Sequence, residues 1–145
     1  MPYSVSRLSY RNRDVRKPEF IAINPFGMVP TVVVDGVPIR ETGAIFEFLL
    51  GMHPTALAVS RSEAQYAEYL VWLHSAEATV FQPVVGYIMN TEILPESERI
   101  AEVARRCGAT WQDFLQIINE TLAGRVFLCG TRFTAADILI GHVLR

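Results

Sequence analysis

Two neighbouring residues, Val29 and Pro30, stand where the backbone could bind a peptide-like ligand. They separate a turn at Gly27 from a run of β-branched residues, and an X-Pro bond at such a junction is a candidate for the cis form. A cis bond would turn the N–H and C=O groups of Val29 away from the sheet, where they could pair with an extended peptide. A trans proline that simply opens a strand is the alternative interpretation.

A second pair of polar residues, Glu41 and Thr42, falls where a predicted strand is followed by a predicted helix. The N–H groups and the dipole at a helix start favour an anion, and a carboxylate beside a hydroxyl can accept hydrogen bonds from an ammonium group. These properties suit the α-amino-acid end of a γ-glutamyl peptide. Plain capping of the helix explains the same two residues equally well.

Basic residues gather near the N-terminus, and one of them could contact a ligand carboxylate. A solvated run of surface charge is the commoner explanation of such a cluster. The cluster comprises Arg7, Arg11, Arg13, Arg16 and Lys17. The sequence shows no Ser/His/Asp or Cys/His arrangement, no paired carboxylates and no phosphate-binding glycine loop. These residues alone therefore predict only a small-molecule or peptide site between an α/β part and a helical part.

Composition places the chain among ordinary globular proteins. Of the 145 residues, 50% are hydrophobic and the formal net charge is −2, which gives no reason to expect nucleic acid or an anionic membrane as a partner. No apolar run approaches the roughly 18 residues of a spanning helix, and the N-terminus lacks the apolar segment of a secretory signal. Cys107 and Cys129 have no Cys or His at ligand spacing, which predicts a reduced, cytoplasmic protein without a metal site.

The elements that must position these residues change in type near residue 55. Before it, Asp35-Gly36 between two β-branched runs predicts a hairpin, and residues 5–10 are a weaker strand candidate. A short helical turn is predicted at 18–22, and a helix at 41–50 with Thr42 as its N-cap and a stop at Gly51 and Pro54.

Beyond residue 55 the pattern is helical. Helices are predicted at 61–90, with a bend at Pro83, and at 97–123, where apolar residues recur with a 3.6-residue period. A last helix should start after Thr134, which with Asp137 resembles a capping box. The first long helix is apolar around much of its circumference, which indicates burial deep in a bundle or in contact with a partner subunit.

Three segments together resemble the glutathione transferase family, most closely its bacterial members. Residues 18–32, PEFIAINPFGMVPTV, resemble that family's PEF-x-x-x-NP-x-G-x-VP segment. Residues 40–45, RETGAI, resemble its ES-x-AI segment, with a threonine in place of the commoner serine. Residues 127–138, FLCGTRFTAADI, resemble the start of a helix in its second domain. The three motifs occur in the family's order and cover nearly the whole chain.

The resemblance implies an α/β part followed by an all-α part. Residues 1–54 would form an incomplete thioredoxin-like, glutathione-binding domain with sheet order 2-1-3-4, and residues 55–145 part of the helical-bundle C-terminal domain. It also implies roles for individual residues. Val29 would pair with the cysteinyl part of glutathione beside a cis-Pro30, Glu41 and Thr42 would hold the γ-glutamyl end, and Arg13 (or Arg11) would lie near the glycyl carboxylate.

The implied activity is conjugation of the glutathione thiolate to a hydrophobic electrophile, as in detoxification, by a cytoplasmic homodimer. The electrophile pocket would draw on Tyr69, Trp72 and Tyr87, and no metal is implied. The family's catalytic Ser, Cys or Tyr follows a first strand that nothing here matches. The catalytic residue is therefore unassigned, and a longer parent chain is expected. A non-catalytic interaction module remains open, as does a related glutathione-dependent isomerase, reductase or dehalogenase.

Overall fold

The computed structural model describes residues 2–53 and 55–145. Met1 and Pro54 lie outside the described residues. Pro54 was one of the two residues predicted to stop the helix at 41–50, so that part of the prediction lies outside the described residues too. The chain forms two compact units, Met1–Leu49 and Leu50–Arg145. The boundary between them falls inside a helix, α2, which spans Thr42–Met52.

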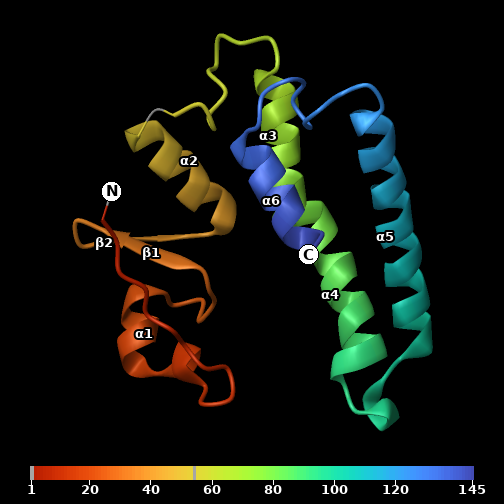
Figure 1. Cartoon of the computed structure of the whole chain (residues 1–145). Coiled ribbons are helices and arrows are strands. Elements are labelled where there is room, and N and C mark those ends of the chain that lie inside the picture. Colours follow the sequence, from red (N-terminus) through yellow and green to blue (C-terminus); the bar gives the residue numbers. More distant parts are fainter. Residues whose placement is uncertain (1, 54) are drawn as a thin grey trace. The chain divides into compact units, whose positions relative to one another are not determined.

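The first unit is built on a β-hairpin (Figure 1). Strand β1 spans Thr31–Val34 and pairs antiparallel with β2, Val37–Arg40. The two turn residues, Asp35 and Gly36, both have positive φ values, 50° and 80°, as the commonest two-residue hairpin turn requires. The hairpin predicted from Asp-Gly is therefore confirmed.

Two short helical segments precede the hairpin. A 3-10 turn, η1, spans Asp14–Arg16, and α1 spans Pro18–Ile23. Pro18 opens α1, where its missing N–H costs nothing because the first helical N–H groups have no partner inside the helix. The predicted turn at 18–22 is thus confirmed. The buried residues of this unit are Val15, Phe20, Asn24, Gly27 and Ile45.

The strand predicted at residues 5–10 is wrong. No residue of that segment is in a strand, and the sheet of the described residues consists of β1 and β2 alone. Tyr3 and Val5 are 84% and 73% exposed. A strand needs a neighbour to accept its backbone hydrogen bonds, and this segment has none. Instead, the N–H of Ser9 donates to Oδ2 of Asp14 at 2.7 Å and the chain turns.

The second unit begins with one long helical run that changes geometry along its length. It consists of α3 (Tyr66–Ser75), the π-helical η2 (Ala76–Phe81), α4 (Gln82–Ile88) and the π-helical η3 (Met89–Ile93). Pro83 is near the start of α4, just after η2. Proline cannot donate to the carbonyl four residues earlier, and the wider π turn falls where that hydrogen bond is missing.

The helix predicted at 61–90 begins five residues late because another structure occupies residues 60–65. The N–H of Ser60 donates to Oε1 of Glu63 at 2.6 Å, and the N–H of Glu63 donates to the carbonyl of Ser60 at 2.9 Å. This reciprocal pair closes a local turn before α3. In the same way, a 3-10 turn, η4 (Glu96–Glu98), delays the start of the next helix.

Two further helices complete the unit. The amphipathic α5 spans Ala101–Leu122 and packs along α4, and α6 spans Ala135–Val143 and packs along α3 (Figure 1). The predicted capping box at α6 is confirmed, since the N–H of Thr134 donates to Oδ2 of Asp137 at 2.8 Å. The other carboxylate oxygen of Asp137 accepts from the N–H of Leu128 at 2.9 Å. No helix among the described residues is both long and apolar enough to cross a membrane.

The loop before α3 is fastened to the start of α6. The N–H of Ala135 donates to the carbonyl of Leu57 at 2.9 Å, and Arg132 donates to the carbonyl of Ala58 at 3.3 Å. Arg132 also pairs with Glu63 at 3.0 Å. Residues 55–65 therefore belong structurally to the second unit.

Candidate functional site

The loop that leads into β1 is organised by one buried amide side chain. Asn24 is 1% exposed. Its Nδ2 donates to the carbonyl of Met28 at 2.7 Å and to Oγ1 of Thr31 at 2.9 Å, and its Oδ1 accepts from the N–H of Phe26 at 3.0 Å. These bonds hold the loop on both sides of Val29. The sequence analysis did not identify this role, although asparagine before proline is typical of such turns.

The peptide bond between Val29 and Pro30 is cis, as expected. Val29 is not part of β1, and within residues 2–53 neither its N–H nor its C=O forms a hydrogen bond to another residue. Its side chain is 43% exposed. An unpaired backbone donor and acceptor next to the end of a strand can receive an extended ligand as an added strand.

Glu41 has an unusual backbone conformation. Its φ is +68°, a region that costs a residue with a side chain about 1–3 kcal/mol and that is concentrated at functional sites. The N–H of Ile45 donates to the carbonyl of Glu41 at 2.9 Å, so Glu41, and not Thr42 as predicted, is the residue that caps α2. Within the described residues the Glu41 carboxylate has no hydrogen bond or ion pair and is exposed. Thr42 follows as the first, half-buried residue of α2.

Arg40 connects the two halves of this region. Its Nε and Nη2 both donate to the carbonyl of Ile23, at 3.1 and 3.0 Å, and its guanidinium is 6.0 Å from the ring centre of Phe26. Arg40 precedes Glu41, and Ile23 precedes Asn24. The arginine therefore ties the end of β2 to the start of the Asn24 loop, a contact across 17 positions that the sequence analysis did not identify.

Arg16, and not Arg13, is the arginine that the structure brings against this loop. Gly27 has a φ of +63°, and an added Cβ atom would lie 2.8 Å from Nη1 of Arg16 and 3.0 Å from the carbonyl oxygen of Val15, so a side chain here would be strained and would push the guanidinium aside. Arg13 is exposed and forms the turn into η1, with φ +54°. Lys17 pairs with Asp14 at 2.7 Å, and this hydrogen bond holds the pKa of the Asp14 carboxyl below its usual value.

The three residues predicted to line an electrophile pocket differ in their surroundings. Tyr69 and Trp72 are 4% and 7% exposed, and the Trp72 ring meets Phe114 of α5 edge to face at 6.2 Å. Tyr87 is on α4 and lies over Gly108 of α5, where an added Cβ would be 3.1 Å from its ring. Tyr69 and Trp72 are therefore buried inside the helical unit, and Tyr87 packs against the neighbouring helix α5.

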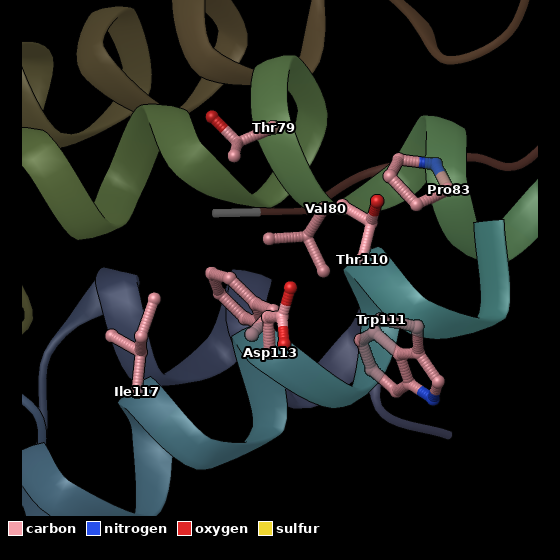
Figure 2. Close-up of a pocket in the computed structure, with 8 residues that line it drawn as sticks. Thr79, Val80, Pro83, Thr110, Trp111, Asp113 and Ile117 are labelled. Atoms are coloured by element: carbon pink, nitrogen blue, oxygen red, sulfur yellow. The ribbon is translucent and has the colours of Figure 1, made fainter. Parts of the chain in front are cut away.

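A separate pocket of about 130 Å³ opens between η2 and α4 on one side and α5 on the other (Figure 2). None of the three predicted residues lines it. Its walls are mostly apolar, and the lining residues are Thr79, Val80, Pro83, Thr110, Trp111, Asp113, Phe114 and Ile117.

Metal-binding clusters and reactive thiols are two further features that a site could use. The described residues contain no cluster of three or more His, Cys, Asp or Glu side chains that could hold a metal ion. Cys107 and Cys129 are free thiols. Burial raises the pKa of the Cys129 thiol, which lowers the fraction of reactive thiolate near neutral pH.

Comparison with known proteins identifies the family. The sequence profile described as "Glutathione S-transferase, N-terminal domain" matches residues 1–50. Glutathione S-transferase GstA of Escherichia coli O157:H7 is 31% identical over 132 residues, and glutathione S-transferase GST-4.5 of Xanthomonas campestris pv. campestris is 25% identical over 135 residues. The chain belongs to the glutathione S-transferase family.

The match to these family members leaves part of their length uncovered. The alignments include 88% and 90% of this chain, but only 61% and 65% of the Escherichia coli and Xanthomonas proteins. Elongation factor 1-gamma of Prunus avium is also similar, at 27% identity over 134 residues, which is 86% of this chain and 29% of that protein.

Solved structures of the family share the fold. The theta class glutathione S-transferase of Xanthomonas axonopodis pv. citri, solved with glutathione bound, superposes with a TM-score of 0.79 at 25% identity over 90% of this chain and 62% of its own. A glutathione transferase of Burkholderia graminis reaches a TM-score of 0.89 at 20% identity, over 100% of this chain and 62% of its own. The predicted fold class is confirmed: part of a thioredoxin-like domain, followed by part of the family's helical domain.

Proposed function

We propose that the first unit binds glutathione through Val29, Pro30, Glu41 and Thr42. The unpaired N–H and C=O of Val29 support this assignment, because they can pair with the backbone of the cysteinyl residue. Asn24 holds the loop on either side of Val29, through Met28 and Thr31, which limits the entropy that binding would cost.

The free carboxylate of Glu41 is the observation that carries the proposal. It is exposed, and its backbone adopts a strained conformation at the start of α2. Strain at an isolated residue is typical of a ligand site. The Glu41 carboxylate would accept hydrogen bonds from the ligand ammonium, while the Thr42 hydroxyl and the first N–H groups of α2 would donate to the ligand α-carboxylate.

A cation would complete the site at the glycyl carboxylate. Arg13 is the residue assigned by family resemblance, whereas Arg16 is the one whose guanidinium lies against Gly27. Either arginine could form a charge-assisted hydrogen bond with a carboxylate. Separate Arg13→Ala and Arg16→Ala variants distinguish them, since only the residue that contacts the ligand should weaken binding.

We further propose that the complete protein is a glutathione transferase that joins the glutathione thiolate to an electrophilic carbon. In that step a C–S bond forms as the electrophile loses its leaving group or takes up the electron pair. Tyr69, Trp72 and Tyr87 remain our assignment for the hydrophobic pocket, with Tyr87 the most exposed of the three at 39%. We also propose a cytoplasmic homodimer that acts in detoxification.

Isothermal titration calorimetry with glutathione tests the site directly. Removal of the Glu41 carboxylate by Glu41→Ala should weaken binding about 10- to 100-fold, which corresponds to the roughly 1.5–3 kcal/mol of a hydrogen bond to a charged group. Glu19→Ala, an exposed carboxylate of α1, is the matched control and should bind like the unmodified chain. Equal affinity of all three proteins would refute the assignment of Glu41.

A second candidate is a non-catalytic module that keeps the fold and serves in assembly. The similarity to elongation factor 1-gamma favours it. Such a module has no need of a free carboxylate at Glu41, so a folded chain with no measurable glutathione affinity would support this alternative.

A glutathione-dependent isomerase, reductase or dehalogenase would use the same binding residues with a different thiol-activating group. Product analysis with an aryl halide and with a mixed disulfide separates conjugation from reduction. A thioether product favours the transferase, and thiol release favours the reductase.

A further inference from the structure

The pocket between η2, α4 and α5 combines an apolar wall with a single carboxylate. Val80 and Phe114 are 2% and 9% exposed and form its base. The rings of Phe114 and Trp111 are nearly parallel, at 12°, with centres 6.3 Å apart. Figure 2 shows Asp113 between Trp111 and Ile117 on α5, with its carboxylate toward the space below η2.

Asp113 has no partner of its own. Across residues 2–53 and 55–145, its carboxylate takes part in no hydrogen bond or ion pair. By contrast, Glu102 and Glu120 on the same helix accept from Arg105 at 2.7 Å and from Gln116 at 2.8 Å. The hydroxyl of Thr110, next to the pocket, already donates to the carbonyl of Arg106 at 3.2 Å, so its oxygen remains available only as an acceptor.

The charged residue among those that line this pocket is therefore an unpaired carboxylate, and none of the lining residues is basic. We propose that the pocket binds a small organic cation, a primary ammonium group on a single aromatic ring or a short branched alkyl group. The ring would lie against Val80, Phe114 and Trp111, and the ammonium would meet Asp113. The proposal concerns the second unit alone and does not depend on glutathione binding.

Size and charge select this ligand class. A closed cavity of about 150 Å³ accommodates benzene, and the pocket's volume of about 130 Å³ is close to that, so one ring would largely fill it. An ammonium next to an indole face and a carboxylate gains both cation–π and ion-pair attraction. An anion of the same size would be repelled by Asp113 with no nearby cation in the pocket lining to compensate.

The test is a ligand-observed NMR titration at neutral pH with benzylammonium as the probe and benzyl alcohol as its neutral counterpart. The unmodified chain should bind the cation at least about fivefold more tightly than the alcohol, because only the cation gains one cation–π contact and one exposed ion pair. Asp113→Asn should reduce that preference about two- to fivefold. Glu120→Gln, a matched loss of one carboxylate on α5, should leave it unchanged.

Two further measurements localise the site. Ile117→Trp places a large side chain at the rim of the pocket and should abolish binding of both probes. Raising the salt concentration from about 0.02 to about 0.5 M should weaken binding of benzylammonium and leave binding of benzyl alcohol unaffected, because exposed charges are screened.

Four results would overturn the proposal. These are no binding of benzylammonium, equal affinity for both probes, equal effects of Asp113→Asn and Glu120→Gln, and loss of binding as the protein concentration rises. The last would mean that a second copy of the chain covers the pocket.

Discussion

Asn24→Ala tests whether the loop before β1 is held by one side chain. The variant removes the bonds to Met28, Thr31 and Phe26. A protein hydrogen bond contributes about 0.5–1.5 kcal/mol net, and a buried partner left unsatisfied costs more. Because these partners are partly exposed, water can replace some of the bonds. We expect the first unit to lose about 2–3 kcal/mol of stability.

Amide hydrogen exchange of β1 measures this loss locally. Protection of the Val32 and Val34 amides should fall by about 30- to 150-fold, the factor that corresponds to 2–3 kcal/mol. Amides in α5 should be unaffected. Asn12→Ala is the control, because only the backbone N–H of Asn12 is bonded, to Oγ of Ser9 at 3.2 Å.

Asn24→Asp separates the donors from the acceptor. It keeps an oxygen for the N–H of Phe26 but loses both bonds from Nδ2, and it turns a carboxylate toward the carbonyl of Met28. It should therefore destabilise β1 at least as much as alanine does. If the β1 amides were as well protected from exchange in Asn24→Ala as in Asn12→Ala, the idea that Asn24 organises the loop would be wrong.

Two other predictions concern the second unit. Gly86→Ala should destabilise it by about 1–3 kcal/mol in urea unfolding, because the new Cβ would lie 2.6 Å from Sγ of Cys107; adding Cys107→Ala should recover most of the loss, and no recovery would exclude this clash as the cause. Glu63 has its pKa lowered first by the backbone N–H of Ser60 and then by Arg132. A lowered folded-state pKa gives stability that is present above the unfolded value of about 4.3 and lost as pH falls through the folded value. Glu63→Gln should therefore flatten the acid limb of the stability profile below about pH 4.3, whereas Glu98→Gln should not.

Local signals in the sequence predicted the elements that depend on a few adjacent residues. Asp35-Gly36 predicted the hairpin because the turn needs two positive φ values that few residues accept. Thr134 and Asp137 predicted the start of α6 because the capping bonds join residues three positions apart. The cis bond before Pro30 was only a candidate from its place between a turn and a strand, and the family resemblance implied it.

Features that depend on distant contacts were not predictable in this way. The segment at 5–10 has strand-like residues but no neighbouring strand. The tie from Arg40 to Ile23 spans 17 positions, and nothing near Arg40 indicates it. The resemblance implied Tyr69 and Trp72 for a ligand pocket, and nothing near them in the sequence indicated that the surrounding helices leave only 4% and 7% of their surface exposed.

The candidate glutathione site likewise contains some residues that the sequence predicted and others that it did not. The spacing of Val29, Pro30, Glu41 and Thr42 around one hairpin was visible in the sequence. Asn24, which holds the loop, and Arg16, whose guanidinium lies against Gly27, became evident only with coordinates. A periodicity argument cannot identify such supporting side chains, because their partners are carbonyl groups that every residue carries.

The fastening of residues 55–65 to the start of α6 has a consequence for synthesis of the chain. Arg132 and the carbonyl of Ala58 are 74 positions apart, and a contact of that span cannot form until the later residue has been made. Domains generally fold in order from the N-terminus, so the loop would stay unfastened while α3, α4 and α5 are being synthesised. A nascent chain that stalls before Arg132 would therefore present this loop to proteases, whereas one that has passed Ala135 would protect it.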